Sequence, residues 1–143
     1  MKITSALAVI LFFSGSVYAA ECTTVAEMDA ADTAASSIKD WAGVYSYYNH
    51  FKQCDDGYIA EGVSATIAGL LANKWNTVEQ LEAMADNNKA FGTWAFNHID
   101  TTATDGDLDR ILKQSRENCP AEHKQFCGKI ENAANQALQD LKE

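Results

Sequence analysis

Proline and β-strand patterns are nearly absent from this 143-residue chain, which contains a single proline. No short stretch alternates apolar with polar side chains while being rich in β-branched residues. Apolar residues instead recur at three- and four-residue spacings, which is typical of amphipathic helices. No repeat, low-complexity tract or linker divides the chain. We therefore predict one all-α domain, a small disulfide-linked bundle of about five to six helices.

Basic residues are also scarce. Lysine and arginine together number 11, against 20 aspartates and glutamates, so the formal net charge is −9. A surface with this balance repels phosphate backbones and anionic lipid headgroups. Nucleic acid and membrane surfaces are therefore the least expected partners.

Long apolar runs are missing except at the N-terminus. Lys2 precedes an apolar stretch, residues 3–13, that is too short to span a bilayer. Val17 and Ala19 then stand where signal peptides carry small residues. We predict a signal peptide over residues 1–19, and a mature domain over residues 20–143 that is periplasmic or secreted and has no membrane anchor. Loss of Lys2 takes the formal net charge from −9 to −10.

The N-terminal part of the mature chain gives two different patterns. Residues 20–35 are rich in Ala, Thr and Asp and poor in large apolar residues. They are expected to form a loose arm, or a marginal helix tethered through Cys22. Beyond them, Trp41 and Tyr45 belong to an apolar series at helical spacing. This series predicts a first clear helix that is capped by Ser37 and ends near Gln53.

A polar break over residues 54–57 separates that helix from the next. Either Asp55 or Asp56 is suited to cap the new helix, because an acid also lies favourably at a helix N-terminus. Small residues such as Gly62 and Gly69 let neighbouring helices come close. We therefore place this helix at the centre of the bundle.

Further helix signals follow in the C-terminal half. Thr77 and Gln80 have the spacing of a capping box, and residues 91–99 predict another short helix. Asp105 or Asp107 is expected to open the next helix. Pro120 ends it, and a last helix starts at about residue 121.

Four cysteines remain after the predicted cleavage: Cys22, Cys54, Cys119 and Cys127. An even number in an exported chain predicts two disulfides. The local pairing joins the first two and the last two, whereas a crossed pairing ties Cys54 to the C-terminal pair. Spacing does not separate these alternatives, because bridging depends on Cα distances.

A metal site is the alternative use of the C-terminal cysteines. Cys119, His123 and Cys127 are spaced four and four, so on a continuous helix they can offer two sulfurs and an imidazole to zinc or copper. However, Pro120 marks a helix start, and thiols of exported proteins are usually oxidised. A disulfide with an exposed histidine is the favoured interpretation, and no metal or other cofactor is predicted.

Signatures of catalysis are missing as well. No nucleophile elbow, Ser-x-x-Lys motif or glycine-rich phosphate loop occurs, and Ser64 is a single serine in a helix. His50, Asp55, Asp56 and Glu61 gather an imidazole and three carboxylates near one turn, which can support acid–base chemistry or bind a hard cation. Helix capping explains the two aspartates more simply, so no catalytic residue is predicted.

One tyrosine of the first helix suggests a contact surface. Tyr47 faces away from the stripe that Trp41, Tyr45 and Tyr48 form at helical spacing. Surface tyrosines are favoured contact residues in protein interfaces. The alternative is a tyrosine that lies flat on the bundle.

The segment of residues 54–63, with its Cys, Gly-Tyr-Ile and Gly, is followed by Leu70-Leu71, a helix start over residues 77–81 and a late Cys119-Pro120. This pattern resembles the small helical, disulfide-bonded immunity proteins that protect the periplasm against type VI secretion amidase effectors. It covers about half of the mature chain, and Trp75 stands where such sequences often have a further cysteine. The resemblance implies a non-enzymatic inhibitor, often a homodimer, that occludes the active site of a toxin.

Taken together, these features predict a non-enzymatic binding protein of the cell envelope with a protein partner. Tyr47, Asp55, Asp56 and Glu61 are its predicted binding residues, since acidic charge speeds the encounter with a basic partner. A periplasmic acid-stress chaperone is an alternative, and so is the metal-binding protein considered above.

Overall fold

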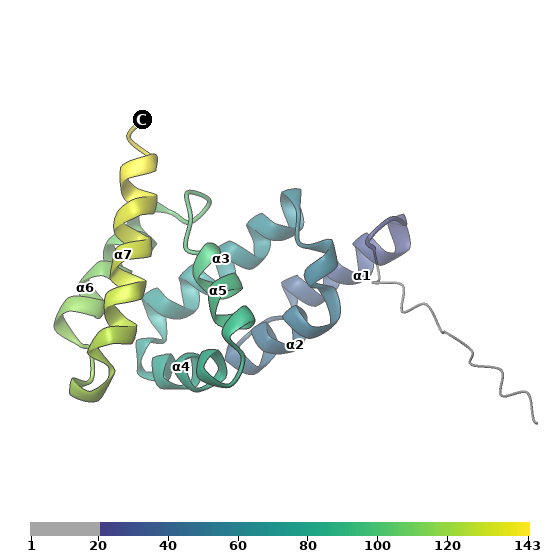
Figure 1. Ribbon diagram of the computed structural model, residues 1–143. Helices are drawn as coiled ribbons and strands as arrows, with labels where there is room; N and C mark the ends of the chain where they lie inside the picture. Colours follow the sequence, from purple (N-terminus) through teal and green to yellow (C-terminus); the bar gives the residue numbers. More distant parts are fainter. Residues whose placement is uncertain (1–20) are drawn as a thin grey trace, which may run out of the picture.

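The computed structural model describes residues 21–143, and within this range every regular element is a helix (Figure 1). The α-helices are α1 (Val25–Ser36), α2 (Trp41–Phe51), α3 (Gly57–Asn73), α4 (Val78–Asn87), α5 (Lys89–Asn97), α6 (Asp105–Glu117) and α7 (Lys124–Asp140). Three short 3₁₀ turns are η1 (Lys52–Cys54), η2 (Trp75–Thr77) and η3 (Ala121–His123). The all-α prediction is confirmed, with more helices than expected. The predicted signal peptide lies outside the described residues.

Helix α3 lies at the centre of the bundle, as predicted. It packs against α1 and α2 on one side and against α6 on the other, while α6 and α7 pair at the far end (Figure 1). Its fully buried residues include Val63, Ile67 and Leu71. The reason offered for this position was partly wrong, because Gly62 and Gly69 have no atom of a neighbouring element within 4 Å of a Cβ position.

The N-terminal segment is helix α1 rather than a loose arm. Thr24 and Glu27 form a capping box, and hydrogen bonds from the Thr24 side chain, the Thr24 backbone and the Thr23 backbone lower the pKa of Glu27. Ala31 and Ala35 are buried, and α1 packs against α3. The Cys22–Cys54 disulfide holds its start. A helix with few large apolar side chains is thus held in the bundle by packing of its alanines and by a covalent bond.

The structure corrects the predicted caps of three helices: α2 and α6, and then α4. Asp40, not Ser37, caps α2, because Ser37 ends α1 and its hydroxyl donates to the carbonyl of Thr33. Thr104 caps α6, and the predicted Asp105 and Asp107 lie in its first turn, where their charge suits the helix dipole.

The capping box predicted at Thr77 does not form. The Thr77 hydroxyl accepts a hydrogen bond from Trp41 Nε1, 2.9 Å away, and donates to the carbonyl of Lys74. The threonine therefore ties the start of α2 to the turn before α4 instead of capping its own helix.

The C-terminal disulfide is also local. Cys119 and Cys127 are bonded across the connection between α6 and α7, so the crossed pairing does not occur. Arg116 and Glu131 join the same two helices by an ion pair of 2.6 Å. The alternative metal set of Cys119, His123 and Cys127 is contradicted, because both sulfurs are used in the disulfide. His123 pairs with Glu82 of α4 instead.

None of the helices in residues 21–143 combines the length and the apolar character that a membrane crossing requires.

Two glycines give opposite predictions for the same substitution. A Cβ at buried Gly92 would lie 2.8 Å from Ala85 Cβ, where α4 and α5 make their close contact, whereas exposed Gly62 has open space around it. We expect Gly62→Ala to raise the free energy of unfolding by about 0.5–1 kcal/mol through helix propensity. Gly92→Ala should lower it by about 1–3 kcal/mol through overpacking. Urea unfolding of both variants tests this, and equal effects would contradict the close α4–α5 contact.

Candidate functional site

A sharp turn over residues 54–57 lies between α2 and α3, and we call it the acidic turn. A disulfide, a helix cap and a glycine backbone conformation stabilise it. The disulfide ties Cys54 to Cys22 ahead of α1. Asp56 caps α3, and its carboxylate accepts from the N–H of Gly57 at 2.8 Å. Gly57 has φ of +53°, a backbone conformation that favours glycine. Sequence and structure agree that one of the two aspartates caps the helix, and the structure assigns the cap to Asp56.

Asp55 points into the protein instead. Its Oδ2 atom accepts a hydrogen bond from Trp94 Nε1 at 2.6 Å and lies 2.9 Å from His98 Nε2. Both partners are near the C-terminal end of α5, about 40 residues further along the chain, with separations of 39 and 43. The carboxylate therefore binds the acidic turn to α5.

The network continues from His98 into α3. The Ser64 hydroxyl lies 2.7 Å from His98 Nδ1 and 2.9 Å from Asp100 Oδ2. Because a carboxylate only accepts, Ser64 donates to Asp100, and its oxygen accepts from Nδ1–H of His98. The imidazole of His98 thus lies between the Ser64 hydroxyl at Nδ1 and the Asp55 carboxylate at Nε2. We call Asp55, Ser64, Trp94, His98 and Asp100 the buried network.

Serine, histidine and aspartate in one hydrogen-bonded chain invite comparison with a hydrolytic triad. Ser64 is only 1% exposed and its hydroxyl is already donated to Asp100. It also lies in the middle of α3, where backbone N–H groups are bonded within the helix, so they cannot stabilise an oxyanion. The arrangement therefore suits the positioning of helices.

Tyr47 does not lie at the surface, so its predicted role as an exposed contact residue is wrong. Its side chain is 2% exposed and packs against Phe51 and Trp94, because α2 is covered on this side as well as on the side of Trp41. The hydroxyl is buried without a hydrogen-bond partner among the described residues. Burial raises the pKa of Tyr47 well above its usual range, and the charges of Asp55 and Asp32 raise it further.

The outer side of the turn carries an aromatic residue that sequence reasoning missed. Tyr58, the second residue of α3, is 59% exposed, and Asp56 and Glu61 are exposed beside it in the chain. We call Asp56, Tyr58 and Glu61 the outer face. A hollow of about 270 Å³ separates Tyr58 from the partly exposed Met28 of α1. The signal was available, because Tyr58 falls outside the series Ile59, Val63 and Ile67 that forms the buried side.

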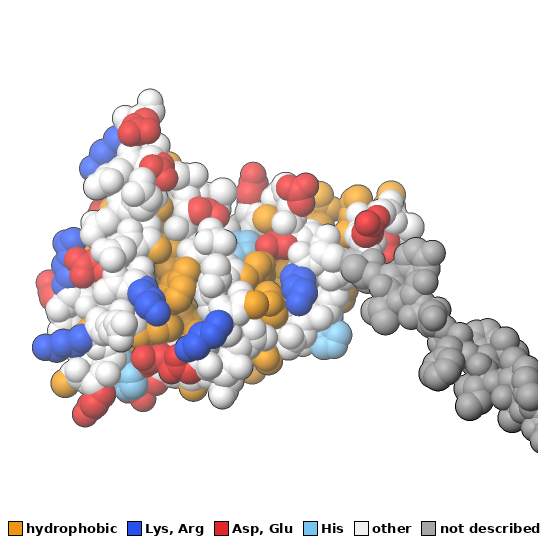
Figure 2. Space-filling view, in the orientation of Figure 1, with side chains coloured by type: hydrophobic (Ala, Val, Ile, Leu, Met, Phe, Trp, Pro, Cys, Tyr) orange, Lys and Arg blue, Asp and Glu red, His pale blue; other side chains and the backbone are white. Residues whose placement is uncertain are grey.

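Figure 2 shows this end of the molecule, where acidic and apolar side chains lie together over α1 and the start of α3. Of the residues predicted to bind, the structure leaves Asp56 and Glu61 exposed and turns Asp55 inward. His50, which the sequence places near the same turn, bonds the carbonyl of Ser46 in its own helix at 2.8 Å. Among residues 21–143, no group of three or more His, Cys, Asp or Glu side chains is arranged to hold a metal ion.

The buried phenol of Tyr47 predicts how stability depends on pH. The folded protein keeps a proton that the unfolded chain releases above about pH 10, so stability falls as the pH rises through this value. Tyr47→Phe should remove the part of this alkaline loss of stability that the Tyr47 phenol causes. At neutral pH it should leave the free energy of unfolding unchanged or up to about 1 kcal/mol higher, because the lost hydroxyl has no partner. Urea unfolding of the wild type and of Tyr47→Phe, near pH 7 and near pH 10.5, measures both effects. If the free energy of unfolding falls equally in the two proteins between these pH values, the buried phenol of Tyr47 is not the cause.

Comparisons of the chain with protein-family models, with curated proteins and with solved structures find no match. The geometry of the acidic turn and its surroundings is therefore the basis for assigning a function.

Proposed function

We propose that this domain is a non-enzymatic binding protein of the cell envelope that inhibits a basic protein partner through the outer face. The observation that supports this most is the exposed Tyr58, which lies between the exposed acids Asp56 and Glu61 directly after the acidic turn. The Cys22–Cys54 disulfide and the inward carboxylate of Asp55 hold this turn in place. Export rests on the signal peptide predicted from the sequence, and the two disulfides are compatible with an oxidising compartment.

Rigidity is the first argument. A loop that must become ordered on binding loses affinity to conformational entropy, whereas a preorganised surface avoids this cost. Here the disulfide at Cys54, the inward carboxylate of Asp55 and the cap at Asp56 fix three successive residues. Tyr58 follows at once on a helix, so its backbone is already in place for contact.

The chemistry of the outer face is the second argument. Tyrosine offers a large ring and a hydroxyl at low entropic cost and is enriched in binding hot spots. Met28 of α1, which lines the same hollow as Tyr58, extends the apolar area and is 36% exposed. Acids around such a centre attract a basic partner and speed association. The formal net charge of −9 acts in the same direction.

The nature of the partner follows from charge rather than from a known relative. A basic toxin or enzyme fits, and the resemblance to amidase immunity proteins makes a cell-wall amidase effector one candidate. Inhibition then consists of covering the partner's active site. Ser64 and His98 do not take part, because both side chains are buried.

Binding should depend on Tyr58 and on charge in distinguishable ways. With the mature domain as bait in envelope extracts, we expect one stable partner whose capture weakens with salt. Tyr58→Ala should weaken its affinity at least about tenfold, mainly by faster dissociation. Glu61→Gln should mainly slow association and reduce the salt dependence. Surface plasmon resonance with the purified partner separates the two rates.

Asp109→Asn, which removes an exposed acid on α6 far along the chain, is the matched control and should bind as the wild type does. Many clients captured mainly at low pH would point to a chaperone instead. A partner bound equally well by Tyr58→Ala would exclude the outer face, and measurable hydrolysis of cell-wall material with no captured protein would overturn the proposal.

A further inference from the structure

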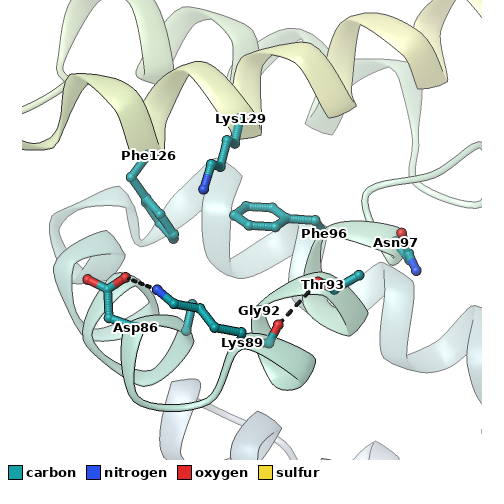
Figure 3. Close-up of a pocket in the computed structure, with 9 residues that line it drawn as sticks. Asp86, Lys89, Gly92, Thr93, Phe96, Asn97, Phe126 and Lys129 are labelled. Carbon is teal, nitrogen blue, oxygen red and sulfur yellow. Dashed lines mark hydrogen bonds and ion pairs between the residues drawn. The ribbon is translucent and has the colours of Figure 1, made fainter.

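A second feature of the surface lies away from the outer face, where α4 and α5 meet α7. A groove of about 330 Å³ opens there, and its walls carry Asp86, Lys89, Phe96, Asn97, Phe126 and Lys129 (Figure 3). Its size is at the lower end of pockets that hold small molecules. None of these residues belongs to the buried network or the acidic turn.

The floor of the groove is apolar and aromatic. The rings of Phe96 and Phe126 have their centroids 5.4 Å apart, and both reach into the space between α5 and α7 (Figure 3). At its base, Gly92 allows α5 to approach Ala85 of α4 closely. Such a floor accepts a flat aromatic or short alkyl body, which prefers an apolar surface to water.

The rim of the groove is basic, although the domain as a whole is acidic. Lys89 on α5 and Lys129 on α7 lie on opposite sides of the groove; Lys129 extends into the space between the helices, and Lys89 extends to Asp86 (Figure 3). Lys89 bonds Asp86 at 2.7 Å, whereas Lys129 has no ion-pair partner among residues 21–143. The Lys89 ammonium lowers the pKa of Asp86 by a hydrogen bond and by its charge, and Lys129 adds a smaller effect in the same direction. The charges of both lysines thus affect the same carboxylate in the groove, that of Asp86.

The surface view shows the same combination. In Figure 2, apolar side chains are exposed between two basic ones, over the gap between α5 and α7. Among the residues that line the groove, one carboxylate, Asp86, accompanies two lysines, so the lining has one positive charge in excess. An added anion is therefore complementary to the rim, and its apolar body to the floor.

We propose that this groove binds a small amphipathic anion, a carboxylate on an aromatic or short alkyl body. The carboxylate lies between Lys129 and Lys89, and the body stacks on Phe96 and Phe126. The Asn97 amide, on the same wall as Phe96, is a further polar group within the lining. This site is separate from the proposed contact with a protein partner, so either can fail without the other.

The test compares two ligands of nearly the same shape, 4-phenylbutyrate and its uncharged amide, by NMR titration of the mature domain. We expect the carboxylate to bind at one site with a dissociation constant of about 0.1–1 mM. Its shifts should centre on Phe96, Phe126 and Lys129 and weaken with salt. The amide should bind at least about fivefold more weakly, because it lacks the charge that the lysines recognise.

Lys129→Gln should weaken carboxylate binding at least about fivefold and leave amide binding unchanged. Lys113→Gln, which removes an exposed lysine of α6 outside the groove, is the matched control and should change neither. Both positions are exposed, so folding should persist, and circular dichroism checks this. No shifts up to the solubility limit, equal binding of acid and amide, or unchanged binding by Lys129→Gln would each overturn the proposal.

Discussion

The carboxylate of Asp55 is the interaction on which the arrangement of this domain depends. It brings the turn before α3 onto Trp94 and His98 of the α5 end, and His98 in turn contacts Ser64 within α3. The neighbouring Cys54 adds a covalent bond to Cys22 ahead of α1. The start of α1 and the end of α5, which are distant in the chain, are therefore joined to the acidic turn at the neighbouring residues Cys54 and Asp55. Their positions determine what the outer face presents.

Such a network contributes more to specificity than to net stability. Taking charged groups out of water has a large cost, and an apolar replacement of the same shape can be as stable. The buried Tyr47 hydroxyl and the second oxygen of Asp55 lack hydrogen-bond partners among the described residues, which adds to that cost. In return, only an acceptor at position 55 satisfies the indole and the imidazole together. We infer that the network selects one packing of α5 against the acidic turn.

The helices could be predicted from the sequence because periodicity is a local signal. The roles of Asp55 and Asp56 could not, because the two residues are chemically identical and differ only in direction. Tyr47 was misjudged for a related reason. The apolar stripe of one helix does not reveal that a second helix covers its other side. The groove was invisible in the sequence, since Phe96 and Phe126 come from helices that pack together only in the fold.

The central claim is that the Asp55 carboxylate holds the acidic turn, and with it the outer face, in one conformation. Amide hydrogen exchange in the wild type and in Asp55→Ala tests this claim most directly. In the wild type, the amides of residues 55–57 should be protected, since they bond Lys52, Cys54 and the Asp56 side chain. We expect Asp55→Ala to speed exchange at these amides and at the end of α5 at least about tenfold, with α7 unchanged. The control Asp109→Ala should exchange as the wild type does. Unchanged protection of residues 55–57 in Asp55→Ala would contradict the account.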